Sequence, residues 1–107
     1  MRVQITARHC DVPDETRLRA TSLMERLEKF DPNLQSADLV FEEGRMGCEV
    51  EGILSIARAE PVVARGDGRD FTAASDDLSD KLSKILRRRR SQRRDRARSS
   101  AAPLAED

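Results

Sequence analysis

The sequence has very few aromatic residues. Its 107 residues include three phenylalanines and no tryptophan or tyrosine. A core built from this composition is aliphatic, and binding of single strands by base stacking is not expected, because stacking needs exposed rings. If a nucleic acid is the ligand, we expect contacts mainly to its phosphate and sugar backbone.

Long hydrophobic runs are also absent. No apolar stretch approaches the ~20 residues that a membrane span requires. Residues 1–6 open directly into a strand pattern instead of the apolar block of a signal peptide. We therefore expect a cytoplasmic protein without a membrane partner.

Cysteine and histidine are too scarce to suggest a reactive or metal site. Cys10 and Cys48 lack the spacing of a metal knuckle or a redox pair, so we expect reduced thiols. His9 with Asp11 supplies at most two metal ligands. Cys10 beside His9 is not a nucleophile–base pair, because neighbours in an extended segment point to opposite sides. We expect no enzymatic activity, metal, cofactor or small-molecule substrate.

Charge is balanced overall but unevenly distributed. Residues 81–98 contain ten basic side chains and one acidic one, whereas residues 1–80 contain ten basic and seventeen acidic ones. The local charges are therefore +9 and −7. Such asymmetry indicates a polyanionic partner, most often RNA or DNA. A merely solvated charge run is the alternative, but crowded arginines repel one another, and arginine is well suited to binding phosphate.

The hydrophobic pattern predicts one α+β domain with the element order β-α-β-β-β-α. Alternation with period two predicts strands, and spacings of three and four predict helices. The predicted strands cover residues 2–7, 37–42, 48–57 and 62–65. The first helix is expected over residues 13–30, and Gly52 is expected to bulge or bend the third strand.

The second helix is expected to begin at Asp70, a good N-cap residue, after a break at residues 66–68. Its apolar stripe is expected to comprise Ala74, Leu78, Leu82 and Ile85. Lys81, Lys84 and Arg88 then lie together on the flank of this stripe. Arg89 falls on the stripe itself, so we expect the helix to have left the core there.

These elements predict a four-stranded mixed sheet with two helices packed on one face. The first two strands flank a helix and are expected to be parallel if they are neighbours. We expect residues 1–90 to form the domain and residues 91–107 to be a basic arm and a disordered tail.

The most specific resemblance lies at residues 68–82, which read Gly-Arg-Asp-Phe-Thr-Ala-Ala-Ser-Asp-Asp-Leu-Ser-Asp-Lys-Leu. This stretch resembles the second-helix motif of the short ribosome hibernation-promoting factors, also called ribosome-associated translation inhibitors. Thr72 stands where that family usually has tyrosine, and Ser75 stands where it has an isoleucine facing the core. A weaker match is Ile5-Thr6 with Arg17 eleven residues later. The similarity covers roughly residues 1–90.

The resemblance implies a factor that binds the rRNA of the small ribosomal subunit in the mRNA and tRNA channel. Such a factor inhibits translation during hibernation or stress and needs no cofactor. The chain is too short for the dimerisation domain of the long members, so we expect a monomer when free. The family's basic positions fall on Arg17, Arg26, Lys81, Lys84, Arg88 and Arg90, and we extend the RNA-binding set along the arm to Arg87, Arg93 and Arg94.

A second hypothesis comes from the acidic body. The chain would then be a protein-interaction module, and its arginine arm would tether it to RNA. Salt-dependent binding to purified small subunits favours the first hypothesis, whereas salt-insensitive capture of another protein favours the second.

Overall fold

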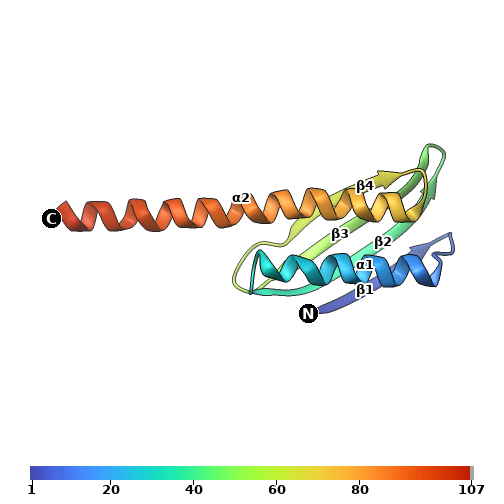
Figure 1. Ribbon diagram of the computed structural model, residues 1–107, viewed down its shortest axis with the longest axis horizontal. Coiled ribbons are helices and arrows are strands. Elements are labelled where there is room, and N and C mark those ends of the chain that lie inside the picture. Colours follow the sequence, from blue (N-terminus) through green and yellow to red (C-terminus); the bar gives the residue numbers. More distant parts are fainter. Residues whose placement is uncertain (107) are drawn as a thin grey trace.

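The computed structural model describes the backbone of residues 1–106 and the side chains of residues 1–92. The elements are β1 (Arg2–Arg8), α1 (Asp14–Arg26), the 3-10 turn η1 (Leu27–Lys29), β2 (Leu34–Gly44), β3 (Gly47–Ile56), β4 (Val62–Gly68) and α2 (Phe71–Glu106). The predicted α+β class and the order β-α-β-β-β-α are confirmed (Figure 1).

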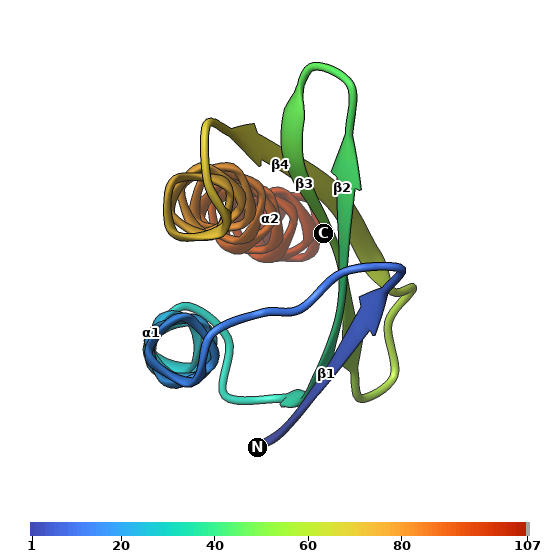
Figure 2. The same cartoon turned by 90° about the vertical axis from the view of Figure 1, so that its right-hand side faces the viewer.

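The four strands form one mixed sheet in the order β1-β2-β3-β4. β1 and β2 are parallel, as expected for strands joined through a helix, and the other two pairs are antiparallel. Figure 2 shows both helices on the same side of the sheet, with α1 lying toward β1 and α2 toward β4. The predicted layering is therefore confirmed, and the opposite face of the sheet is left open.

The helix α2 buries a leucine stripe against the sheet. Ala74, Leu78 and Leu82 are fully buried, as predicted. Leu86, at 1% exposure, completes the stripe, whereas Ile85 only packs against its edge. The apolar contact of α2 with the sheet thus ends one residue before the first arginine.

Two strand glycines allow α2 to approach the sheet closely. A Cβ at Gly66 would lie 2.4 Å from the Ala74 carbonyl oxygen and 2.5 Å from the Leu78 nitrogen. A Cβ at Gly52 would lie 2.9 Å from a Leu78 methyl group. The glycines therefore serve packing, because any side chain there would collide with the helix.

Two predictions about these glycines are wrong for this reason. Residues 66–68 do not break the chain but extend β4, which runs to Gly68. Gly52 is paired in register with its neighbours, and the sheet irregularity lies in β2 between Leu34 and Ser36. Both predictions rest on the backbone freedom of glycine, whereas here the missing side chain leaves room for α2.

The helix starts follow from local chemistry. The Asp70 carboxylate accepts a 2.7 Å hydrogen bond from the Ala73 N–H, which confirms the predicted N-cap. α1 begins directly after Pro13, with Asp14 in its first turn, where the helix dipole favours acids. Residues 27–29 continue α1 as a tighter 3-10 turn, so the predicted helix over residues 13–30 is α-helical only to Arg26.

The predicted boundary between a domain of residues 1–90 and an arm and tail of residues 91–107 stays a prediction. The side chains of residues 93–107 lie outside the described part of the structure, as does the backbone of Asp107. Across the described residues, no helix is long and apolar enough to span a membrane.

The glycine contacts predict a sharp difference between two alanine substitutions. Gly66→Ala should destabilise the fold by about 1–3 kcal/mol, because its methyl group would press against helix backbone that cannot rotate away. Gly44→Ala is the matched control, because a Cβ there meets its nearest atom at 3.7 Å. Urea denaturation of both variants measures the effect. Equal stabilities would contradict the close approach of α2 to β4.

Candidate nucleic-acid interface

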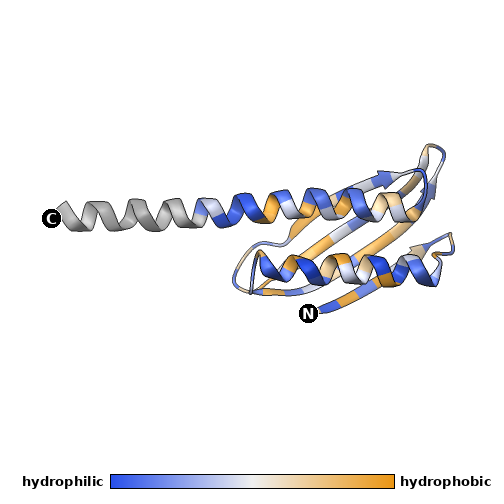
Figure 3. Ribbon diagram, viewed as in Figure 1, coloured by the Kyte–Doolittle hydropathy of each residue, from blue (hydrophilic) through white to orange (hydrophobic). Residues whose placement is uncertain are grey.

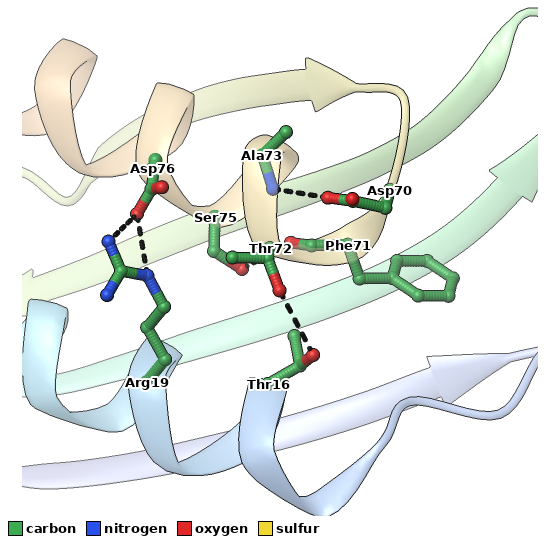
Figure 4. A network of polar contacts seen from close by, with 8 residues as sticks. All are labelled: Thr16, Arg19, Asp70, Phe71, Thr72, Ala73, Ser75 and Asp76. Atoms are coloured by element: carbon green, nitrogen blue, oxygen red, sulfur yellow. Dashed lines mark hydrogen bonds and ion pairs between the residues drawn. The ribbon is translucent and has the colours of Figure 1, made fainter.

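The helices α1 and α2 run side by side in the same direction and are joined by polar contacts along a seam (Figures 1 and 4). The Thr16 and Thr72 hydroxyl oxygens lie 3.3 Å apart. One turn further, the Arg19 guanidinium donates to the Asp76 carboxylate at 2.8 and 3.0 Å. Thr72, which replaces the tyrosine of the resembling family, thus has a specific partner on α1.

Ser75 is a buried polar residue, and its hydroxyl has a hydrogen-bond partner. Its side chain is 2% exposed, and its hydroxyl donates a 2.8 Å hydrogen bond to the Phe71 carbonyl. The position faces the core, as the family's isoleucine does. Bonding within its own helix lets the hydroxyl remain there, because a buried donor without a partner would be costly.

At the far end of the seam, the Lys29 and Arg87 side chains lie close to the Phe30 ring. The Arg87 guanidinium carbon lies 5.5 Å from the centre of the Phe30 ring, and the Lys29 ammonium lies 5.1 Å from it. The Arg87 Nε also donates to the Ser83 carbonyl at 3.4 Å. Two weak contacts therefore orient Arg87 on the α1 side of α2, in the manner of a cation–π pair.

Lys81 lies on the opposite flank of α2 and is engaged within the protein. Its ammonium donates to the Arg65 carbonyl and pairs with the Asp77 carboxylate, both at 2.9 Å. Asp77 also accepts a 3.0 Å hydrogen bond from the Asp67 N–H. These contacts connect α2 to β4, so Lys81 has a structural role beside any part in binding.

The same contacts shift both ionisable groups. The Asp67 N–H, followed by the Lys81 ammonium, lowers the pKa of the Asp77 carboxyl below its ordinary 3.8. The hydrogen bond from Asp77 raises the pKa of the Lys81 ammonium above its ordinary value. Each charge stabilises the other, as opposite charges in contact do.

The structure divides the predicted residues of α2 between two flanks. Lys84 and Arg88 are exposed, and their spacing places them on the β4 side with Lys81. Arg90 is exposed three residues after Arg87, which places it on the α1 side. The sequence predicted the common flank of Lys81, Lys84 and Arg88, but not that the other flank, with Arg87 and Arg90, borders the seam.

The two predicted residues of α1 also separate. Arg26 is exposed and lies seven residues after Arg19, so it is on the flank that faces α2. Arg17 is about 160° around the helix from Arg19 and thus away from α2. Its Nε donates to the Val12 carbonyl at 3.2 Å. Arg17 is therefore not part of the seam.

We define the basic seam end as Arg26, Lys29, Arg87 and Arg90, with Phe30 between the helices. Lys29 was not among the predicted residues. Its signal in the sequence is a cation directly before Phe30, at the end of the first helix. Figure 3 shows the corresponding change along α2, which becomes strongly hydrophilic after the last buried leucine.

Arg89 occupies the end of the apolar stripe, as predicted. It is partly buried, and its Nη1 donates to the Glu60 carbonyl at 3.3 Å. It thereby closes the contact between α2 and the β3–β4 turn. Arg93 and Arg94, the last two predicted residues, have side chains outside the described part of the structure.

The arrangement is suited to binding phosphate. Guanidinium groups donate paired hydrogen bonds to phosphate oxygens, and those of the seam end are exposed and share one side. Among the described residues, no group of three or more histidine, cysteine or acidic residues could hold a metal ion.

Comparison with known proteins defines the class. Residues 3–94 match the model of the family described as "Sigma 54 modulation protein / S30EA ribosomal protein". The chain belongs to this family, and the resemblance to ribosome hibernation factors is confirmed.

Individual relatives agree with this assignment. The chain is 31% identical to the ribosome hibernation promoting factor of Azotobacter vinelandii over 86 residues, which covers 80% of this chain and 79% of that protein. Its fold is similar to a ribosomal subunit interface protein from Coxiella burnetii, with a TM-score of 0.78, 16% identity and coverage of 85% and 99% of the two chains. It is also similar to the N-terminal domain of Thermus thermophilus Protein Y, with a TM-score of 0.72, 19% identity and coverage of 82% and 98%.

The pair of Asp77 and Lys81 predicts a pH dependence of stability. The folded state holds the pKa of Asp77 below the unfolded value, so this contribution is present above that value and is lost as pH falls through the folded pKa. Asp77→Asn should therefore melt at a lower temperature than the wild type at pH 7, and the difference should close as the pH falls through the lowered pKa of the folded Asp77 carboxyl. Asp80→Asn, on an exposed site of the same helix, is the control. A pH-independent difference would contradict this assignment.

Proposed function

We propose that this protein binds the rRNA of the small ribosomal subunit in the channel used by mRNA and tRNA, and that it inhibits translation there during hibernation or stress. The observation that carries this proposal is the basic seam end on a chain of the S30EA family. The Azotobacter vinelandii relative is named a ribosome hibernation promoting factor, which supports the same role. The protein would act in the cytoplasm and be monomeric when free.

Phosphate contact is the chemistry expected at this surface. Arg26 and Arg90 are exposed, and Arg87 is already oriented by Phe30, so less conformational entropy is lost when it binds. Contacts to phosphate position a protein on RNA but carry little sequence information. Recognition would then depend on the shape of the folded RNA.

The acidic body restricts how the protein can lie on RNA. Residues 1–80 carry a charge of −7, so most of the surface is repelled by phosphate. The basic seam end and the arginines that follow are the exception. We therefore expect α2 to supply most of the affinity, and expect that affinity to depend strongly on salt.

Removing the exposed charges of α2 tests this interface. Lys84, Arg87, Arg88 and Arg90 are replaced together by glutamine, while Lys81 is kept because it connects α2 to β4. If all four contact phosphate, the slope of log affinity against log salt should become less negative by about 3 units. Sedimentation with purified small subunits at several salt concentrations measures this slope.

A matched variant controls for net charge. Replacement of Arg2, Arg8, Arg45 and Arg69 by glutamine removes the same charge from exposed positions outside the two helices. Its slope should remain near that of the wild type. An equal loss in both variants would mean that net charge, and not the α2 surface, governs binding.

The proposed location predicts competition with the normal occupants of the channel. Two bodies cannot fill one groove, so ribosomes preloaded with mRNA and initiator tRNA should resist inhibition in a purified translation system. Ribosomes that meet the protein first should fail to initiate. Full occupancy of one subunit by this protein and initiator tRNA together would place the binding site elsewhere.

A further inference from the structure

The face of the sheet opposite the helices has no covering element among the described residues (Figure 2). Each strand has a buried set of side chains under the helices and an alternating outward set. A half-open antiparallel sheet usually carries mixed polar groups on its wet face. Here the outward set has a distinct arrangement of charge.

One cross-strand row places acids beside acids. Glu42 of β2 is directly opposite Glu49 of β3, and Glu49 is directly opposite Asp67 of β4. Like charges directly opposite one another destabilise a sheet. Arg8 of β1, opposite Glu42, ends the row. Among the described side chains, neither Glu42 nor Glu49 forms an ion pair.

In the adjoining cross-strand row, Arg65 of β4 forms an ion pair with Glu51 of β3. Arg65 donates a 3.1 Å hydrogen bond to Glu51, the residue directly opposite it. This hydrogen bond, followed by the charges of Glu51, Glu49 and Glu42, raises the pKa of Arg65 above its ordinary value. The guanidinium groups of Arg65 and Arg8 therefore stand against four acids in these two rows, and this part of the face retains negative charge for a cationic partner. The four acids are Glu42, Glu49, Glu51 and Asp67.

The same face also exposes apolar groups. Val63 is 57% exposed, and it is directly opposite the partly exposed Ile53. Val40, opposite Glu51, adjoins this pair. A hollow of about 50 Å³ on this face could receive part of a side chain. It is lined by two cations, three carboxylates and one apolar side chain: Arg8, Arg65, Glu42, Glu49, Glu51 and Val40. Apolar and acidic side chains thus lie beside one another on the open face, where one extended peptide could contact both kinds.

We infer that this open face binds an extended, lysine- and arginine-rich protein segment, with apolar side chains on Val40, Ile53 and Val63 and its cations on the acidic row. Phosphate would be repelled by this face, so the partner is a protein and not RNA. The source of the segment rests on the proposed function. A protein sharing the same RNA particle carries basic segments, because these neutralise phosphate.

A synthetic peptide of twelve residues that alternates lysine and valine is the probe, and its binding to the free protein is measured by calorimetry at low salt. Glu42→Gln combined with Glu49→Gln should weaken binding on the order of tenfold. Glu25→Gln combined with Glu60→Gln removes the same charge from exposed positions off this face and should change affinity less than twofold. Thermal melting of both variants confirms that they fold.

A second pair of variants tests the apolar part. Val63→Ser should also weaken binding, whereas Leu18→Ser, at a 72% exposed position on α1, should not. Equal affinities across each pair, or peptide-induced amide shifts confined to the helices, would overturn the inference. Because no ribosome is present, the result is independent of whether the protein binds small subunits.

Discussion

The close approach of α2 to the sheet is the constraint on which the other features depend. Gly66 removes the side chain that would collide with the helix backbone, and Leu78 occupies the space over Gly52. This contact fixes both the distance of α2 from the sheet and the rotation of α2 about its own axis. Rotation of a helix decides which side chains are buried and which flank the neighbouring helix. The seam with α1 and the positions of the described cations of α2, from Lys81 to Arg90, follow from it.

One helix therefore combines two tasks along its length. Leu86 is the last buried leucine of the stripe, and Arg87 directly follows it on the exposed α1 side. A charged group on an element anchored by the core is held more accurately than one on a loop. The Phe30 ring adds local orientation at the point where the anchored part ends. The core and the candidate interface are thus parts of the same packing arrangement.

The sequence predicted the elements well because periodicity reports which residues face the core. It also predicted the Asp70 cap, which depends on local chemistry. The core-facing position of Ser75 was implied only by the family resemblance. The sequence placed Lys81, Lys84 and Arg88 on one flank of α2, but it did not show which flank lies beside α1, because that depends on the tertiary arrangement. Asp77 lies one helical turn from Lys81, so spacing alone brings these two side chains together. The Arg65 carbonyl is sixteen residues away on β4, and only the fold brings it to Lys81.

The neutral total charge conceals an uneven distribution of charge over the molecule. Acids adjoin one another across β2, β3 and β4, although cross-strand pairing of like charges opposes sheet formation. The leucine core on the other side tolerates this cost because it provides the larger contribution to stability. If the protein binds RNA as proposed, this distribution would attract the basic seam end and repel the acidic rows of the open face, so one orientation would be favoured before close contact. The arrangement of charge, and not its sum, determines how this protein would approach a polyanion.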